Sequence, residues 1–401
     1  MREGWEVKPL KEMCLIKPPK SEARKGQNAD FLVSFAPMET LGIDQKYLIT
    51  NQTRTMSDVV GSYTYFSNGD VLLAKITPCF ENGKLGIASD LINNIGFGSS
   101  EYIVFRANEQ LDAEWLYYYL SRQSFRNEGA SRMAGAVGHK RITKDFIEDY
   151  PIPIPPLPEQ RRIVAILDKA FEGIATAKAN IEKNLQNARE IFESHLNAVF
   201  SQRGEGWVDR RLGDVAMEFG RGKSKHRPRN DPKLYGGSFP FIQTGDVRNS
   251  SHLITSYDQT YNDAGLAQSK LWPKGTLCIT IAANIAETGI LDFDACFPDS
   301  IIGLVANEKI STNKYIEYLL TSFKSRLQLL GKGSAQDNIN LATFESQYFP
   351  FPPLSSQKEI VSIFDDLHEE TQHLESIYQQ KLAALDELKQ SLLHQAFNGN
   401  L

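Results

Sequence analysis

The residues best suited to chemistry in this sequence lie in a glycine-spaced basic stretch, residues 219–229. It holds five cationic side chains: Arg221, Lys223, Lys225, Arg227 and Arg229. Cations at this spacing, on a backbone loosened by glycine, can follow the phosphates of a nucleic acid. A solvated loop without a ligand would have the same composition, so both interpretations stay open.

A polar turn at residues 241–248 comes next. Its side chains include Gln243, Thr244 and Arg248, and glutamine and arginine can bind the edges of adenine and guanine with two hydrogen bonds each. An ordinary turn between strands would look the same. Weaker candidates for contact with a nucleic acid lie at predicted strand ends: Lys75, Thr77 and Lys84 in the first half of the chain, and Asn284 in the second.

Two glycine-rich loops, 131–142 and 331–339, occupy matching places in the two halves of the chain. Each precedes a long helical stretch, and their polar residues differ. We expect this of two domains that read two different sequences, although loop plasticity alone can also produce it. The candidate residues are Arg132, His139, Lys140 and Arg141 in the first loop, and Lys332, Ser334, Gln336 and Asn338 in the second.

Motifs of catalysis are missing from the sequence. It contains no Gly-x-x-x-x-Gly-Lys-Ser/Thr phosphate loop, no Asp/Asn-Pro-Pro-Phe/Tyr methyltransferase tetrapeptide and no His-Glu-x-x-His zinc motif. The four cysteines are far apart, which favours reduced, buried thiols over a zinc site. We therefore predict a protein that is not an enzyme and that carries no catalytic, cofactor-binding or metal-binding residues.

The candidate loops must be held by a scaffold. The most regular pattern in the sequence is a segment that occurs twice. Residues 155–200 return at 352–397 with a constant offset of 197 positions and no gap. Each copy opens with Pro-Pro-Leu and has glutamine at its sixth position, Gln160 in the first and Gln357 in the second. An ungapped match over about 45 residues predicts one structural unit that is built twice.

Both copies are predicted to be long helices with an apolar seam. Apolar residues recur at alternating steps of three and four, as in a coiled coil. Pro158 marks the first helix start, and Ser355 or Ser356 is expected to cap the second. The predicted seam comprises Ile163, Leu167, Ala170, Ile174, Ile181, Leu185, Ala188, Phe192, Leu196 and Phe200, then Ile360, Phe364, Leu367, Leu374, Tyr378, Leu385, Leu388, Leu392 and Phe397.

A helix of this length, roughly 65 Å, is too long to bury its seam against a single domain. The other copy is the expected partner. Because the first helix leads from one globular block to the next, and the second helix follows that block, we predict antiparallel pairing with the blocks at opposite ends.

The predicted fold class is α+β, with two mixed α/β blocks separated by two long helices. The boundaries are 1–150 for the first block, 151–204 for the first helical region, 205–350 for the second block and 351–401 for the second helical region. Within the blocks we expect strands at 71–76, 102–105, 277–281 and 301–305, and helical segments at 113–127 and 313–330. Residues 48–60 are ambiguous.

The net charge of -5 does not exclude a polyanionic partner. Residues 351–401 carry three basic and eight acidic side chains, so this region alone holds the excess of negative charge. The blocks are close to neutral, and a nucleic acid would have to meet local basic patches on them. The sequence opens without an apolar targeting segment and has no apolar run of membrane-spanning length, which predicts a cytoplasmic protein.

The whole chain resembles the specificity subunit of type I restriction-modification systems, the HsdS family. The resemblance lies in two divergent blocks, each followed by Pro-Pro-Leu-x-x-Gln and a long heptad helix, and in the ending Gln-Ala-Phe-Asn-Gly-Asn-Leu at 395–401. The second helix start departs slightly, with Ser355-Ser356 in place of Pro-Glu.

This resemblance implies that each block is a target recognition domain for one half of a split DNA site. The helices would be the family's central and distal conserved regions, fixing the spacer and docking two modification subunits. Those partners would bind S-adenosylmethionine, and restriction subunits would bring ATP and Mg-dependent cleavage, so no cofactor is expected on this chain. Two alternatives remain, namely a two-headed coiled-coil adaptor that binds only proteins, and a stand-alone DNA-modifying enzyme.

Overall fold

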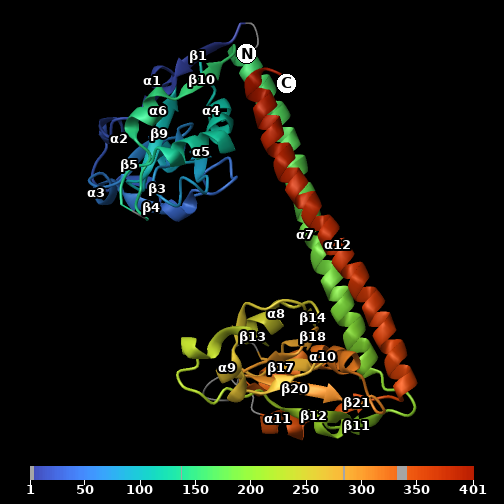
Figure 1. The fold of residues 1–401 in the computed structure, drawn as a ribbon. Coiled ribbons are helices and arrows are strands. Elements are labelled where there is room, and N and C mark those ends of the chain that lie inside the picture. Colours follow the sequence, from blue (N-terminus) through green and yellow to red (C-terminus); the bar gives the residue numbers. More distant parts are fainter. Residues whose placement is uncertain (1–3, 137, 283–284, 332–340) are drawn as a thin grey trace. The chain divides into compact units, whose positions relative to one another are not determined.

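The computed structural model describes residues 4–136, 138–282, 285–331 and 341–401 (Figure 1). The chain forms two compact units, Met1–Ile181 with Gln379–Leu401, and Glu182–Tyr378. The two long helices, α7 (Leu157–Ser201) and α12 (Leu354–Asn398), each contribute one part to each unit. No helix in the described ranges combines the length and apolar character needed to cross a membrane.

The first unit is built on two four-stranded sheets and a two-stranded ribbon, in the strand orders β2-β9-β6-β7, β4-β3-β8-β5 and β1-β10. Its strands are β1 (Glu6–Pro9), β2 (Cys14–Ile16), β3 (Leu32–Ala36), β4 (Gln52–Thr55), β5 (Thr64–Ser67), β6 (Val71–Ala74), β7 (Leu85–Ile87), β8 (Ile95–Gly98), β9 (Tyr102–Ala107) and β10 (Pro151–Ile154). Its shorter helices are α1 (Leu10–Met13), α2 (Ser21–Arg24), α3 (Met56–Val59), α4 (Ala113–Leu120), α5 (Gln123–Ser131) and α6 (Lys144–Asp149), with 3-10 turns η1 (Met38–Thr40) and η2 (Ile92–Asn94).

The second unit follows the same plan with one more strand, in the orders β12-β20-β17-β18-β14, β15-β13-β19-β16 and β11-β21. Its strands are β11 (Val208–Arg210), β12 (Ala216–Arg221), β13 (Tyr235–Phe241), β14 (Leu253–Ile254), β15 (Gln259–Tyr261), β16 (Leu271–Trp272), β17 (Leu277–Thr280), β18 (Thr288–Leu291), β19 (Ala295–Cys296), β20 (Ile301–Ala306) and β21 (Phe349–Phe351). Its shorter helices are α8 (Thr244–Asn249), α9 (Asp263–Ala267), α10 (Asn313–Gly331) and α11 (Leu341–Ser346), with 3-10 turns η3 (Leu212–Val215) and η4 (Pro232–Leu234).

The α+β fold class predicted from the sequence is confirmed. The predicted strands appear as β6, β9, β17 and β20, and the ambiguous stretch 48–60 contains β4 followed by α3. The predicted helix 113–127 is broken into α4 and α5, because Arg122 takes an extended backbone conformation between them. Its counterpart in the second unit, α10, is one continuous helix.

One aromatic side chain in each unit ties the helix after the sheet to the strand that leads into the long helix. In the first unit Trp115 on α4 is fully buried, and its indole N–H donates to the Pro153 carbonyl of β10 at 3.0 Å. In the second unit buried Tyr315 on α10 donates to the Pro350 carbonyl of β21 at 2.8 Å. Different residue types thus satisfy the same buried backbone acceptor.

Within each unit, α7 and α12 pack side by side in antiparallel orientation (Figure 1). In the first unit Lys178 of α7 pairs with Asp386 of α12, and in the second unit Arg189 pairs with Glu375 at 2.6 Å. The antiparallel pairing predicted from chain order is confirmed. The placement of the two blocks at opposite ends stays a prediction.

Two details of the predicted helices are wrong. Leu374 and Leu388 are 38% and 46% exposed and lie outside the packed face, where the predicted Tyr378 is half-buried together with Thr371 and Leu382. The predicted seam of α12 is therefore wrong at these two leucines. Ser355 and Ser356 are also not N-caps, because α12 already begins at Leu354.

A buried glutamine joins each block to its long helix. Gln160 is 0% exposed, and its amide donates to the carbonyls of Pro155 at 2.8 Å and Gln110 at 2.9 Å while accepting from the Asp112 N–H at 2.9 Å. These three hydrogen bonds join the Gln160 side chain to the loop before α4 and to the residues at the start of α7. A fully satisfied buried amide of this kind specifies one docking geometry.

Gln357 repeats this arrangement in the second unit. It is 1% exposed, and its amide donates to the carbonyls of Pro352 and Ile310, both at 2.9 Å, and accepts from the Ser311 hydroxyl at 2.8 Å. The sixth residue of the repeated motif is therefore a structural joint in both units.

The first block also contacts the helices through charged side chains. Lys46 donates to both carboxylate oxygens of Asp168 on α7, at 2.7 and 2.9 Å, and to Glu114 on α4 at 2.7 Å. Asp44 pairs with Lys389 on α12 at 2.7 Å. The segment before β4 is thereby held against both long helices.

The second block uses histidine at the corresponding contact. His252 Nδ1 lies 2.9 Å from the buried carboxylate of Glu317 on α10, and its ring centroid lies 4.1 Å from that of His368 on α12. Burial, and next the neighbouring His252, lower the pKa of His368 to about 4. Phe171 occupies the matching position of α7, where it packs edge-on against Tyr118.

Replacing the buried glutamine of either joint with alanine should destabilise its unit. The Gln160→Ala variant leaves the Asp112 N–H and two carbonyls without their partner, and unpaired buried groups of this kind cost about 2–4 kcal/mol together. The same loss is expected for Gln357→Ala. Urea denaturation of the purified chain measures it, with Gln186→Ala on the exposed face of α7 as control. Loss no larger than that of the control would mean that the buried amides are not the joints.

The His368→Phe variant should weaken the pH dependence of stability. Folding lowers the pKa of His368 from an ordinary value near 6.5 to about 4. The stability that neutral His368 contributes is therefore complete above the ordinary pKa and is lost as the pH falls toward 4. At pH near 5.5 the loss attributable to His368 is about 1 kcal/mol after allowing for its partial exposure. Thermal melts across pH 4.5 to about 7.5 test this.

The control for this variant is His373→Phe, at an exposed position of the same helix. It should keep the acid sensitivity of the unmodified chain, whereas His368→Phe should flatten it. Equal acid sensitivity in all three chains would contradict the assignment.

Candidate nucleic-acid interface

Five of the predicted contact residues of the first block converge in the structure. The loop after α5 folds back on the end of β6: the Thr77 N–H donates to the Lys140 carbonyl at 3.0 Å, and the Ile142 N–H donates to the Lys75 carbonyl at 2.9 Å. His139 and Lys140 are exposed at the tip of this hairpin. Residues far apart in sequence thus share one edge, which we name the first polar edge (Lys75, Thr77, His139, Lys140 and Arg141).

A carboxylate orders this edge. Arg141 donates to both oxygens of Glu101, at 2.8 and 3.0 Å, and Lys75 Nζ lies 3.8 Å from the same carboxylate. These hydrogen bonds lower the pKa of Glu101. Arg141 and Lys75 are therefore held in place, whereas the tip residues project into solvent.

Two other predicted residues of the first block have structural partners elsewhere. Lys84 Nζ donates to the Met38 carbonyl at 2.8 Å, which ties β7 to the turn η1. Arg132 pairs with Glu128 one helical turn earlier at 2.8 Å and lies over the Phe146 ring at 5.4 Å. Lys84 was predicted at a strand end beside Lys75, and Arg132 was predicted in the same loop as Arg141, but the structure separates both from the first polar edge.

The basic stretch of the second block is anchored by one acidic residue. Arg221 at the end of β12 donates to the Asp299 carbonyl at 2.8 Å, and Arg229 donates to the Asp299 carboxylate at 2.6 Å. Arg227 lies 3.9 Å from the same carboxylate and donates to the Ser224 carbonyl at 2.6 Å. The loop is therefore ordered by its own contacts, and its role in binding a nucleic acid stays a prediction.

Lys223 and Lys225 lie between the anchored residues Arg221 and Arg227. Both are exposed, and neither has an ion pair within the described part of the chain. This order leaves two lysine charges directed at solvent from an ordered loop, a suitable arrangement for meeting phosphates.

The polar turn 241–248 forms the start of α8. Gln243 is its N-cap, closed by a capping box with Asp246, and the Gln243 amide donates to the Gln259 side chain at 2.7 Å. Thr244 is half-buried, and Arg248 is exposed in the last turn. The predicted residues Asn284, Lys332, Ser334, Gln336 and Asn338 lie outside the described residues.

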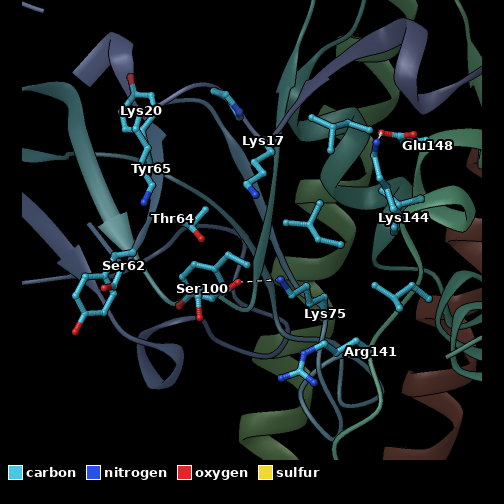
Figure 2. A pocket seen from close by; sticks show the side chains of 17 residues that line it. Lys17, Lys20, Ser62, Thr64, Tyr65, Lys75, Ser100, Arg141, Lys144 and Glu148 are labelled. Carbon is cyan, nitrogen blue, oxygen red and sulfur yellow. Dashed lines mark hydrogen bonds and ion pairs between the residues drawn. The ribbon is translucent and has the colours of Figure 1, made fainter. Parts of the chain in front are cut away.

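The first block contains a groove that was not predicted from the sequence. A cavity of ≈ 810 Å³ lies beside the first polar edge and shares Lys75 and Arg141 with it (Figure 2). Three further cations line it: Lys17, Lys20 and Lys144. The run Lys-Pro-Pro-Lys at 17–20 is a signal that could have drawn attention to the first two.

Histidine, cysteine and carboxylate side chains do not gather into a metal-binding group of three in the described ranges. Cys14, Cys278 and Cys296 are buried and Cys79 is half-buried, all as free thiols. Burial raises the pKa of Cys14 to about 12, which makes this thiol unreactive. The expected burial is confirmed for Cys14, Cys278 and Cys296.

The family model described as "Type I restriction modification DNA specificity domain" matches residues 2–187 and 204–383. The two matched segments each contain one block and most of the helix that follows it. The predicted internal repeat thus coincides with two copies of one family domain.

Individual specificity subunits are also similar in sequence to this chain. The type I restriction enzyme EcoAI specificity subunit of Escherichia coli is 37% identical over 163 residues, 40% of this chain and 27% of that protein. This chain therefore matches about a quarter of the length of that relative. The putative type I restriction enzyme MjaX specificity subunit of Methanocaldococcus jannaschii is 24% identical across 92% of this chain and 88% of its own length.

Two solved structures share the fold. A chain from the study titled "Structural basis underlying complex assembly and conformational transition of the type I R-M system" superposes with a TM-score of 0.84 at 21% identity, over 100% of this chain and 99% of that chain. The HsdS subunit from Thermoanaerobacter tengcongensis gives 0.66 at 20% identity, over 100% and 98%. The family match over both halves and the shared fold lead to one conclusion: this chain belongs to the family of type I restriction-modification DNA specificity (HsdS) subunits.

Proposed function

We propose that this chain acts as the DNA specificity subunit of a type I restriction-modification complex, with each block reading one half of a bipartite site. The proposal rests on one observation: the same scaffold occurs twice in the chain, and the polar loops of the two copies differ. Equivalent buried glutamines hold both blocks to the helices, while the exposed residues near the equivalent strands β6 and β17 differ. Two readers of unlike half-sites require this combination.

The chemistry of the loops favours DNA over a protein partner. The loop after β12 holds two exposed lysines between anchored arginines, and the first polar edge presents His139 and Lys140. Lysine charges suit phosphates, and Arg248 at the exposed end of α8 has the side chain that reads guanine. A purely protein-binding adaptor would not need basic loops in both blocks.

The helix pair is assigned two tasks in this proposal. Its length sets the spacer between the half-sites, and its exposed faces dock two modification subunits. As a specificity subunit, the chain is the non-catalytic member of the complex. Methyl transfer from S-adenosylmethionine and ATP-driven cleavage with Mg belong to the modification and restriction subunits, with which the chain acts in the cytoplasm.

Exchanging the second block should change one half-site and leave the other unchanged. The exchange comprises residues 207–353, so that β11 and β21 remain paired and α12 still begins at Leu354. The spacer should keep its length because neither long helix is altered. Sequencing the methylated motif in cells that carry the complete system measures both features.

The reciprocal exchange of residues 5–155 is the matched control, and it should alter the opposite half-site. Simultaneous change of both half-sites by either exchange would contradict separate reading. Recovery of a continuous motif, or of no motif, from the unmodified system would contradict the proposed function itself.

Reversing the two exposed lysine charges of the second block should weaken DNA binding. The Lys223→Glu/Lys225→Glu variant places two carboxylates where phosphates are expected, and we expect affinity to fall about tenfold or more at moderate salt. Fluorescence anisotropy of the assembled complex on DNA carrying its motif provides the measurement.

The control for this charge reversal is Lys309→Glu, an exposed lysine between β20 and α10. Lys309→Glu should weaken DNA binding much less, because Lys309 lies outside the loop after β12. Its neighbour Ile310 accepts a hydrogen bond from Gln357 at the joint with α12. Equal effects of the two variants would indicate a general response to charge and not a contact of this loop.

A further inference from the structure

The groove beside the first polar edge collects cations from three separate segments of the first block. Lys17 and Lys20 follow β2, Lys75 follows β6, and Arg141 and Lys144 lie before and in α6 (Figure 2). We name this cavity the basic groove, defined by these five residues. Convergence of this kind cannot arise from one charged run in the sequence and requires the fold.

Its charges are only partly balanced. Arg141 is neutralised by its two hydrogen bonds to Glu101, and Lys144 lies 3.3 Å from Glu148, the carboxylate among the groove's lining residues. Lys17, by contrast, has no ion pair within the described ranges. Positive charge therefore remains at the end of the groove formed by the segment 17–20.

Lys20 carries the clearest sign of this excess. Its Nζ donates to the carbonyls of Val60 at 3.1 Å and Gly61 at 2.9 Å, but among the described residues it reaches no carboxylate. Burial, followed by repulsion from Lys17 and Arg24, lowers the pKa of Lys20. An anion bound between Lys17 and Lys20 would relieve this repulsion and gain from both charges.

The walls suit a phosphate group. Ser62, Thr64 and Tyr63 bring hydroxyl groups to the lining, and Ile16, Ile103 and Ile142 form apolar parts of it. Hydroxyls donate to phosphate oxygens, and apolar walls reduce the screening of the lysine charges by water. Lysine is a point charge without the planar fork that reads base edges, so this set of groups favours backbone over bases.

The groove is also continuous with the residues expected to meet DNA. Arg141 and Lys75 belong both to the basic groove and to the first polar edge, whose tip residues His139 and Lys140 are exposed. A strand whose bases meet that tip would have its neighbouring phosphates close to the groove.

We propose that the basic groove holds backbone phosphates of the DNA strand read by the first block, and so contributes affinity and register without reading sequence. This inference rests on the proposed function, because it presupposes that the first block binds DNA. It assigns a role to Lys17, Lys20 and Lys144, which were not among the contact residues predicted from the sequence.

The test removes the unbalanced charge from the assembled complex with its modification subunits. For Lys17→Gln/Lys20→Gln, binding to DNA carrying the methylated motif should weaken about five- to tenfold, and the slope of log Kd against log salt should fall by about one to two. Anisotropy titrations between about 50 and 200 mM salt give both quantities. The methylated motif should stay unchanged.

The matched control is Lys8→Gln/Lys11→Gln, which removes the same charge from β1 and α1, where the two lysines form surface ion pairs with Glu6 and Asp149. The single variant Lys17→Gln tests whether the weaker binding results from misfolding. The exposed Lys17 side chain has no ion pair in the described chain, so its removal should leave the fold intact. This variant should reproduce part of the loss with an unchanged melting temperature.

The outcomes separate the two proposals. An unmodified complex without a bipartite motif would overturn the proposed function. A normal motif with an affinity and salt slope in the double variant equal to those of the control would overturn the basic groove alone. A changed motif in the double variant would also overturn it, because the groove would then be reading bases.

Discussion

The buried amides of Gln160 and Gln357 are the constraint on which the rest of this structure depends. Each side chain donates to one carbonyl at its own helix start and to one carbonyl of the loop before the block's helix. A glutamine with its donors and acceptor all satisfied tolerates little displacement, because any shift would leave buried polar groups unpaired. The long helix and the block therefore meet in one defined geometry in each unit.

Around these joints the two units reach the same result with different residues. Trp115 and Tyr315 both donate to a proline carbonyl in the strand before the long helix. Tyr118 and Tyr318 both donate to the helix carboxylates, Asp168 and Asp365. Each of these positions requires a side chain that is long enough to donate a hydrogen bond to the buried acceptor. The residue type can therefore differ between the two units while the scaffold stays the same.

Charge is distributed according to these roles. The acidic excess lies in the region of α12, where Glu375 and Asp386 pair with α7 and Asp365 pairs with Lys314 of α10. In the basic loop of the second block, Arg229 is anchored by Asp299, whereas Lys223 and Lys225 are left exposed. Anchoring lowers the entropic cost of presenting a charged loop to a ligand.

The sequence by itself determined the duplicated plan, the two 45-residue helices and their antiparallel pairing, because a repeat and a heptad period are local and regular signals. It could not decide which leucines of α12 pack, since Leu374 and Leu388 fit the period but face solvent. It also could not separate Lys84, bonded to the Met38 carbonyl, from Lys75 at the polar edge.

Only the tertiary structure brought Lys17 and Lys20 beside Arg141 and Lys144, or set the three arginines of one loop around Asp299. Such groupings depend on strand order and on which segments cross each sheet, and these are decided by the packing of the whole unit. Periodicity describes what a segment can bury, but the neighbours of a polar side chain are set by contacts between segments that are distant in the chain.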